Sequence, residues 1–468
     1  MVRSMRKLLV CLLAVVLVSG LSGLGSDAAA ADEQDGPWQQ SRHNAQHNPV
    51  LSSGVDEIYT GVIHTPDEVR ATPSINNGKL FVANHPSGYL LAYDLVSGEE
   101  LWRAQAPNWV HSEMVHRDGH VFVGYGNRHM KDDGVRGTGE NGVLCLDADT
   151  GEVVWQAETD GEVMPTPAVV GDSVYIATGD RHLYELDPET GEKVVRAELG
   201  GNANMSDPTV IDGMLYVGAS GTTPNVFTAY DTEADEVAWQ REFDKTRSMG
   251  DVPPAIAGGI VVTTAPITLP EDDFDDGVHE RHMIFAMDAT TGELLWQDAL
   301  GQGPAATNNR SGAPMIHDGT VYVGSPITKA AYAYDLYSGE RKWVYHTGAV
   351  KGAPVAADGT VYFATTDGWI HALDVATGDK VGERYLGGAL APSGPAIVDD
   401  VLIVGSQDNN VYLVPTTKIL GTQSFVSGTS PVLITVTIGL GVLVLALATV
   451  VVLQARQLRQ RSVPRRRA

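Results

Sequence analysis

The chain has 468 residues, with 58 acidic and 32 basic side chains and a formal net charge of −26 at pH 7. So negative a balance repels phosphate backbones and anionic lipid headgroups, and it excludes a general nucleic-acid-binding protein. The length alone suggests two or three domains, unless internal repeats divide the chain differently.

The N-terminus has the three-part layout of a secretory signal peptide over residues 1–31. A basic start precedes the apolar run from Leu8 to Val18, and the small residues from Ser26 to Ala31 follow it. An uncleaved N-terminal anchor is the alternative, although the apolar run is short for a membrane span. Cleavage removes Cys11 and leaves Cys145 as the one remaining cysteine, so we expect no internal disulfide.

A repeated motif occupies the middle of the chain. Each copy contains an apolar run that ends in an aspartate. A turn sequence follows the aspartate, usually with Ser or Thr, then Gly and an acidic residue, and in five copies a tryptophan comes after the turn. The aspartates lie 39 to 57 residues apart, a spacing typical of propeller blades. The residues that carry the motif, all expected to be structural, are Asp94, Trp102, Asp147, Gly151, Trp155, Asp187, Gly191, Asp231, Trp239, Asp288, Gly292, Trp296, Asp335, Gly339, Trp343, Asp374 and Gly378.

Each copy predicts four short antiparallel strands. In the third copy we expect strands over 166–170, 173–177, 183–186 and 193–197. The motif itself is a turn between the third and fourth strands, in which the aspartate accepts backbone N–H bonds and the glycine adopts positive φ. The tryptophan is expected to fill the gap to the next blade and not to bind a cofactor.

An eighth unit begins at Leu390 but stops before its fourth strand. An open edge in the ring is unfavourable, so another segment must supply that strand. Residues 55–64, which are strand-like and precede the first full copy, are the natural donor. The sequence therefore predicts an all-β fold, a single eight-bladed β-propeller of four-stranded antiparallel blades over residues 32–420.

The C-terminal part predicts a membrane anchor. A linker over 421–431 leads to residues 432–453, which are uncharged and long enough to cross a bilayer as one helix. Residues 454–468 contain six arginines and no acidic residue, which places this tail in the cytoplasm and the propeller outside it. Without the predicted signal peptide and tail, the remaining chain holds 23 basic and 57 acidic residues.

The motif resembles the repeat of the PQQ-type, or quinoprotein-like, propellers. The segment Trp38-Gln-Gln-Ser-Arg42-His43-Asn44 also resembles the opening of such proteins, and the likeness extends over residues 38–415. In size the chain is most similar to the non-catalytic, BamB-like members, which take part in outer-membrane protein assembly. BamB itself is a lipoprotein, whereas this chain has a predicted C-terminal helix, so the resemblance does not transfer particular partners.

The same family contains PQQ-dependent alcohol dehydrogenases, and fold alone does not separate enzyme from scaffold. Those enzymes often carry a vicinal cysteine pair, which this chain lacks. They also hold Ca²⁺ with carboxylate and amide oxygens, and Ca²⁺ takes six to eight such ligands. Here the residues available for a quinone–calcium site are Glu113, Asn204, Asp251 and Arg310.

Aligning the copies places one residue of each at the mouth of the central channel. These residues are Arg70, His111, Met164, Met205, Asp251, Ser311, Lys351 and Pro392, and the neighbours expected to face inward are Glu113, Asn204, Asn308, Asn309 and Arg310. We expect the ligand- or partner-binding rim to comprise Arg70, His111, Glu113, Asn204, Asp251, Asn309, Arg310 and Lys351. Its charge is mixed, with no concentration of carboxylates.

The sequence thus favours an exported, membrane-anchored propeller that acts as a non-catalytic interaction scaffold or ligand-binding module at the cell surface. Its expected partner is a protein or peptide, with no nucleic acid, no metal and no catalytic residue. The alternative is an alcohol or sugar dehydrogenase that uses PQQ with Ca²⁺. A surface sensor is disfavoured because the tail of 15 residues holds no signalling domain.

Overall fold

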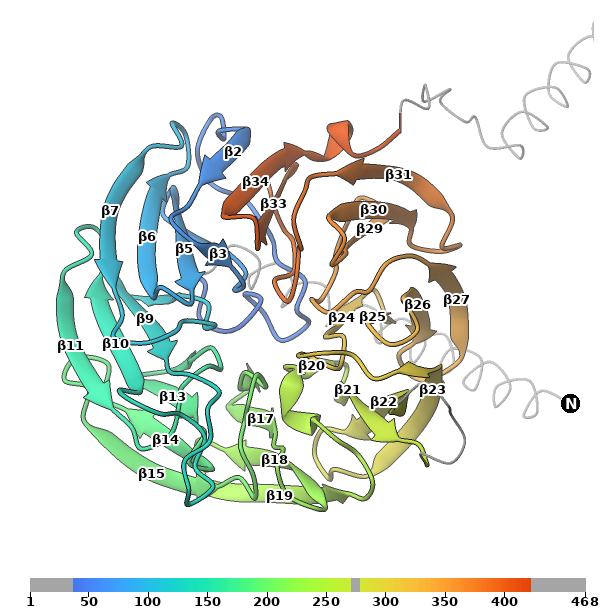
Figure 1. Ribbon diagram of the computed structural model, residues 1–468, viewed down its shortest axis with the longest axis horizontal. Coiled ribbons are helices and arrows are strands. Elements are labelled where there is room, and N and C mark those ends of the chain that lie inside the picture. The colour runs from blue at the N-terminus through green and yellow to red at the C-terminus, as the bar shows by residue number, and fades with distance from the viewer. Residues whose placement is uncertain (1–36, 271–277, 422–468) are drawn as a thin grey trace, which may run out of the picture. The chain divides into compact units, whose positions relative to one another are not determined.

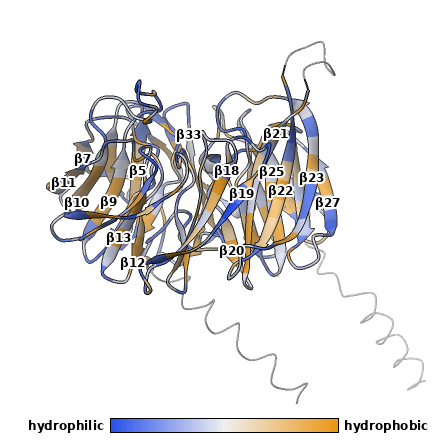
Figure 2. Ribbon diagram, turned by 90° about the horizontal axis from the view of Figure 1, so that it is seen from below, coloured by the Kyte–Doolittle hydropathy of each residue, from blue (hydrophilic) through white to orange (hydrophobic). Residues whose placement is uncertain are grey.

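Eight β-sheets are arranged in a ring around one central axis in the computed structural model, which describes residues 37–270 and 278–421 (Figure 1). The prediction of an all-β, eight-bladed propeller of four-stranded antiparallel blades is confirmed. Apolar residues gather on the strands (Figure 2), and the core lies between neighbouring blades. One cluster, for example, joins Phe81 and Leu90 of the first blade to Val121 and Leu144 of the second.

The first four blades follow one another along the chain. Blade 1 comprises β4 (Ser74–Asn76), β5 (Lys79–His85), β6 (Tyr89–Asp94) and β7 (Glu100–Gln105), with β3 (Glu68–Val69) also paired to β5. Blade 2 comprises β8 (Val115–Arg117), β9 (His120–Tyr125), β10 (Gly142–Asp147) and β11 (Val153–Glu158). Blade 3 comprises β12 (Ala168–Val170), β13 (Ser173–Ala177), β14 (His182–Leu186) and β15 (Lys193–Glu198). Blade 4 comprises β16 (Thr209–Ile211), β17 (Met214–Gly218), β18 (Asn225–Asp231) and β19 (Glu236–Phe243).

The other four blades complete the ring. The short 3₁₀ helix η1 (Met249–Asp251) leads into blade 5, which comprises β20 (Ala255–Ala257), β21 (Ile260–Thr268), β22 (His279–Asp288) and β23 (Leu294–Pro304). Blade 6 comprises β24 (Pro314–His317), β25 (Thr320–Ser325), β26 (Ala330–Asp335) and β27 (Arg341–His346). Blade 7 comprises β28 (Val355–Ala357), β29 (Thr360–Ala364), β30 (Trp369–Asp374) and β31 (Lys380–Tyr385). Blade 8 comprises β32 (Ala396–Val398), β33 (Val401–Ser406) and β34 (Asn410–Pro415), after which the 3₁₀ helix η3 (Thr416–Lys418) follows.

The N-terminal part of the chain closes blade 8, as predicted. Strand β2 (Gly61–His64) pairs antiparallel with β34, with Ile63 opposite Val411. A second strand, β1 (Val50–Leu51), pairs in parallel with β32 on the inner side, which the sequence did not indicate. Both edges of the last blade are therefore covered by residues that come before the first blade.

The repeated turn has the predicted chemistry. Asp147 Oδ1 accepts the backbone N–H of Asp149 and Thr150 at 3.0 and 2.8 Å, and these bonds contribute to a lowered pKa of Asp147. Gly151 has φ of 72°, a conformation that side chains with a Cβ resist. The same turn recurs at Asp94, Asp187, Asp288, Asp335 and Asp374.

Each motif tryptophan lies over the turn of the next blade. A Cβ added to Gly151 would lie 2.5 Å from the Trp102 ring, and Trp102 Nε1 donates to the carbonyl of Ala148 at 3.0 Å. The same contact joins Trp155 to Gly191, Trp239 to Gly292, Trp296 to Gly339 and Trp343 to Gly378. At the ring closure Tyr59 takes this place over Gly98. The predicted packing role of the tryptophans is confirmed.

The seam between blades 3 and 4 differs from this pattern. Val195 occupies the tryptophan position and is 51% exposed, and Asp235, with φ of 56°, occupies the glycine position. Here Arg196 bridges the two blades, with Nη1 3.0 Å from Asp235 and Nε 2.6 Å from Glu185. An ion pair therefore replaces the buried indole at this seam.

The predicted signal peptide over 1–31, membrane helix over 432–453 and cytoplasmic tail over 454–468 lie outside the described residues. Within 37–270 and 278–421, no helix is long and apolar enough to span a membrane.

Candidate functional site: the mouth and throat of the central channel

An N-terminal segment, residues 38–49, lies in the centre of the ring (Figure 1) and binds seven blades in turn. The inner strand of each blade has an edge that faces the channel, and backbone N–H groups on such an edge need acceptors. The segment supplies these acceptors, which are backbone carbonyl oxygens except at Gln40 and Asn48, where the side-chain amide oxygen accepts. The acceptor residue, the donor residue and their N···O distance are Trp38 and His116 (2.7 Å), Gln39 and Val169 (2.8 Å), Gln40 and Val210 (2.8 Å), Ala45 and Ile256 (2.7 Å), Gln46 and Ile316 (2.9 Å), Asn48 and Ala356 (2.7 Å), and Pro49 and Ile397 (2.9 Å). The segment thus forms a floor inside the channel.

Above this floor lie two connected cavities, which we call the throat and the mouth. The throat, about 60 Å³, is lined by residues of the floor and by the loops that lead into the inner strands. The mouth, about 450 Å³, is lined by those loops and by the loop between β9 and β10. The two cavities share Arg70, His111, Met205, Asp251 and Asn309, so the throat opens into the mouth.

The rim residues expected from the sequence line these cavities. Arg70, His111, Asp251 and Asn309 line both, while Lys351 lines the throat and Asn204 and Arg310 line the mouth. Glu113 is not at the rim, because its side chain lies at the floor and accepts Trp38 Nε1 at 2.9 Å and the Arg42 backbone N–H at 2.8 Å.

Arginines dominate the mouth. Among the described residues that line it, four are arginines, namely Arg70, Arg128, Arg136 and Arg310, and one, Asp251, is acidic. Three of these arginines are paired with a glutamate outside the lining: Arg70 with Glu68 at 3.0 Å, Arg136 with Glu162 at 3.0 Å and Arg310 with Glu280 at 2.7 Å.

These ion pairs position the guanidinium groups. The side chains of Glu162 and Glu280 are fully buried behind the mouth, and burial raises the pKa of Glu162 to about 7. Arg128 instead binds the amide oxygen of Asn308 on the opposite loop, and no carboxylate among the described residues pairs with it. Arg128 is therefore the cation of the mouth that is most available to a ligand.

The histidines at the mouth add no charge near neutral pH. Burial lowers the pKa of His111 well below its usual value, and His85, Arg70, Arg136 and Arg128 lower it further. The pKa of His85 falls to about 4 for the same leading reason, burial. Burial also lowers the pKa of Lys351, and the charge of Arg70 contributes. The cationic groups that line the mouth are therefore its arginines, which stay protonated.

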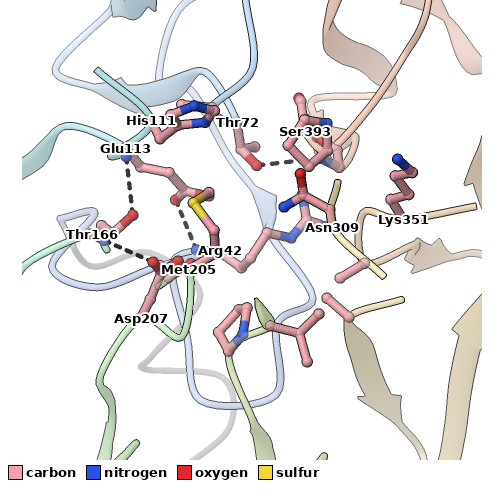
Figure 3. A pocket seen from close by; sticks show the side chains of 18 of the residues that line it. Arg42, Thr72, His111, Glu113, Thr166, Met205, Asp207, Asn309, Lys351 and Ser393 are labelled. Atoms are coloured by element: carbon pink, nitrogen blue, oxygen red, sulfur yellow. Dashed lines mark hydrogen bonds between the residues drawn. The ribbon is translucent and has the colours of Figure 1, made fainter. Parts of the chain in front are cut away.

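The throat combines cations and carboxyl groups below the mouth (Figure 3). Arg42 extends from the Glu113 side of the throat towards Asn309, and its Nη2 donates to the carbonyl of Pro354 at 2.9 Å. Burial lowers the pKa of Arg42 to about 10, so its guanidinium stays charged at neutral pH. Asp207 accepts the Thr166 backbone N–H at 2.7 Å, and burial, followed by the charge of Glu113, raises the pKa of Asp207 to about 7.

The calcium ligands considered from the sequence do not come together. Asn204, Asp251 and Arg310 meet at the mouth, where Asp251 accepts the backbone N–H of Arg310 at 3.2 Å, but Glu113 is engaged at the floor. Within the described ranges, no group of three or more His, Cys, Asp or Glu side chains is placed to hold a metal ion. Cys145 is buried in blade 2. These residues do not fit a calcium-held quinone.

Sequence reasoning missed three cations of the site. Arg128 and Arg136 belong to the loop between β9 and β10, and the alignment of copies considered only the loops that lead into inner strands. The unusual length of that loop, from 126 to 141, was the available signal. Arg42 was noted as part of the opening segment, but nothing local in the sequence indicates that this segment enters the channel.

Comparison with known proteins agrees with the fold. A family model described as "Outer membrane protein assembly factor BamB" matches residues 27–137, 139–382 and 280–418. The chain is 27% identical to a tetrathionate hydrolase of Acidithiobacillus ferrooxidans over 368 residues, which are 73% of this chain and 72% of that protein. It is 24% identical to BamB of Escherichia coli over 433 residues, 87% of this chain and 98% of that protein.

Solved structures show the same architecture. BamB from Moraxella catarrhalis superposes with a TM-score of 0.55 at 18% identity, covering 76% of this chain and 96% of that one. A quinohemoprotein alcohol dehydrogenase from Comamonas testosteroni superposes with a TM-score of 0.57 at 15% identity, covering 82% and 78%. The motif, the ring of eight blades and the family match together show that the chain belongs to the BamB-like family of PQQ-repeat β-propellers.

Proposed function

We propose that this protein is an exported, membrane-tethered ligand-binding module whose channel mouth binds a small anionic ligand. The observation that carries the proposal is the convergence of Arg70, Arg128, Arg136 and Arg310 on one cavity of a chain whose net charge is −26. In so acidic a protein, this cavity presents four guanidinium groups and one carboxylate, and the glutamates that pair with Arg70, Arg136 and Arg310 lie outside its lining.

The size and chemistry of the mouth support a small ligand. Cavities of about 300–1,000 Å³ are typical of small-molecule sites, and the mouth has about 450 Å³. Guanidinium groups bind carboxylate and oxoanion groups through paired N–H bonds. Trp109 and the amides of Asn204 and Asn308 complete the lining and can contact the uncharged part of a ligand. An acidic segment of a partner protein would present the same charges but has to enter a blind cavity.

Titration calorimetry of the purified protein tests the proposal. Tetrathionate, citrate and a glutamate-rich peptide serve as anions, and a lysine-rich peptide serves as the opposite charge. We expect a small anion to bind, and its affinity to fall as salt rises from about 50 to about 500 mM. Arg128→Gln should weaken binding roughly threefold to tenfold.

Arg103→Gln is the matched control, because Arg103 is an exposed arginine on the outer strand β7, paired with Glu100. It removes the same charge and should leave affinity unchanged. If both variants weaken anion binding equally, the anion is attracted by non-specific electrostatics and does not bind specifically at the mouth. Binding of the acidic peptide alone would favour the protein-interaction form of the module, and binding of neither anion would overturn the proposal.

The proposed location rests on the two ends of the sequence. A cysteine at Ser424, before the proposed membrane helix, should react with an impermeant thiol reagent on intact cells, and one at Ser462 in the tail should not. Cys145 is buried, so background labelling should be low. The reverse pattern would contradict the orientation.

A second candidate is hydrolysis of an anionic sulfur compound. The 27% identity to a tetrathionate hydrolase favours it, together with Asp207, a buried carboxyl group of the throat whose pKa is raised to about 7 and which could act as a base near neutral pH. Incubation with tetrathionate separates the two candidates. A hydrolase consumes many moles of tetrathionate per mole of protein, and the Asp207→Asn variant should lose this turnover. A binding module leaves tetrathionate intact.

The dehydrogenase alternative is tested by titration with PQQ and Ca²⁺. Micromolar binding that Asp251→Ala abolishes, with dye reduction in the presence of an alcohol or aldose, would favour it over the binding module.

A further inference from the structure

Several buried polar groups of the throat have no hydrogen-bond partner among the described residues. They are Nε and Nη1 of Arg42, Nε of Arg70, Nδ1 of His111 and Oγ of Ser311. The residues Arg42, His111 and Ser311 are only 3%, 8% and 0% exposed. All four residues line the same cavity of about 60 Å³.

Such a concentration is unusual for a folded protein. Nearly all buried polar groups are hydrogen-bonded, and each one left unsatisfied costs about 1–3 kcal/mol, more when it is charged. At roughly 10–15 Å³ for each water, the throat has room for about four to six waters, comparable to the five heavy atoms of a sulfate ion. The unpartnered groups of Arg42, Arg70 and Ser311 are hydrogen-bond donors. A neutral His111 has a single ring proton, and its unpartnered Nδ1 donates when it carries that proton.

We propose that the throat is a binding site for a small oxoanion of the size of sulfate, either free or as the end group of the ligand in the mouth. The inference rests on the proposed function, because the anion reaches the throat through the mouth. Arg42 supplies the deepest contact, because its Nη1 has no partner among the described residues and can donate a charge-assisted N–H bond to the anion while Nη2 stays on Pro354. Arg70, His111 and Ser311 lie on the loops above it.

The carboxyl groups of the throat are compatible with an anion because their oxygens already have partners. Glu113 accepts from Trp38 and the Arg42 backbone, and Asp207 accepts from the Thr166 backbone. Asp251 accepts from the Arg310 backbone and from Asn204. Arg42 and Lys351 offset part of their charge, and Asp207 is half protonated near pH 7, so binding should strengthen as the pH falls below 7.

Calorimetric titration of the purified protein with sodium sulfate at constant ionic strength tests the site, with tetrathionate as the longer anion. Ser311→Ala removes one unpartnered hydroxyl without opening the floor, and Arg42→Gln removes the deepest guanidinium. Each should weaken sulfate about tenfold or more, as expected for a lost hydrogen bond to a charged group. Arg128→Gln, in the mouth, should change sulfate affinity less than about twofold, because Arg128 does not line the throat.

The outcomes separate the throat from the mouth. If tetrathionate binding depends on Arg128 while sulfate is insensitive to Ser311→Ala and Arg42→Gln, the throat site is wrong and the proposed function stands. If sulfate depends on Ser311 but tetrathionate does not bind, the throat takes free oxoanions and the mouth proposal fails. Sulfate that binds only weakly and equally to all variants is an adventitious ion only. Should Arg42→Gln not fold, as circular dichroism would reveal, Ser311→Ala alone decides.

Discussion

Individual buried carboxyl groups do two kinds of work in this molecule. Glu162 and Glu280 lie behind the mouth and orient Arg136 and Arg310. Asp207 accepts the Thr166 backbone N–H inside the throat, and no arginine among the described residues forms an ion pair with it. Removing Arg310 would therefore leave a buried carboxylate without its partner, so variants of Arg310 change stability as well as binding.

Asp207 makes the stability of the protein depend on pH. Its pKa is about 7 in the folded chain and 3.8 as an ordinary aspartate, so the folded state holds a proton that the unfolded chain has lost. The free energy of unfolding therefore falls as pH rises from about 4 to 7. Asp207→Asn keeps the acceptor for Thr166 and removes the titration. Relative to this variant, the free energy of unfolding of the wild type should fall by up to about 4 kcal/mol as the pH rises over that range. Above about pH 8 the difference between the two proteins should stay constant.

Denaturant unfolding of both proteins at several pH values between 4 and 9 provides the measurement. Parallel curves for wild type and variant would show that Asp207 titrates as an ordinary aspartate, against this account.

At the scale of the elements, the turn of one blade and the tryptophan of the preceding blade form one unit. Trp102 is 7% exposed and covers Gly151, whereas its neighbour Leu101 is 46% exposed on the other face of β7. Trp102→Ala should cost roughly 3–5 kcal/mol of stability through lost packing between blades. Leu101→Ala, as the control on the same strand, should cost less than about 0.5 kcal/mol. Equal effects in thermal and denaturant unfolding would contradict this packing role.

The blades were predictable because their determinants are local. An aspartate, a glycine and a tryptophan within nine residues specify both a turn and an interblade contact, and the sequence shows all of them. The seam of Val195 and Asp235 departs from the motif, and sequence alone did not indicate that Arg196 bridges it. The loop carrying Arg128 and Arg136 has no repeat to align, so its contribution to the mouth needed the structure.

At the scale of the whole molecule, the N-terminal residues close the ring and form the channel floor. Closure was predictable, because the eighth copy lacks a strand that must come from elsewhere. The floor was not, because its hydrogen bonds join residues as far apart in the chain as Asn48 and Ala356. Neighbours so distant leave no periodic pattern in the sequence.

Ring closure gives a prediction from two adjacent residues. Ile63 of β2 is 5% exposed, and Val62 beside it is 37% exposed. Ile63→Asp places a carboxylate in the core of blade 8 and should detach β2, expose the edge of β34 and cause aggregation. Val62→Asp should remain monomeric with a nearly unchanged melting temperature. Size-exclusion chromatography and thermal melting compare the two, and a monomeric, cooperatively melting Ile63→Asp would contradict closure by β2.

The proposed binding of an anion at the mouth of the channel can be tested directly by crystallography. Crystals of the protein with tetrathionate, at a concentration that saturates binding in solution, test it through the anomalous scattering of sulfur. We predict ligand density beside Arg128 and Arg136, with an end group directed into the throat. Density on the outer strands, or an unoccupied mouth at saturating tetrathionate, would show that the mouth is not the anion site.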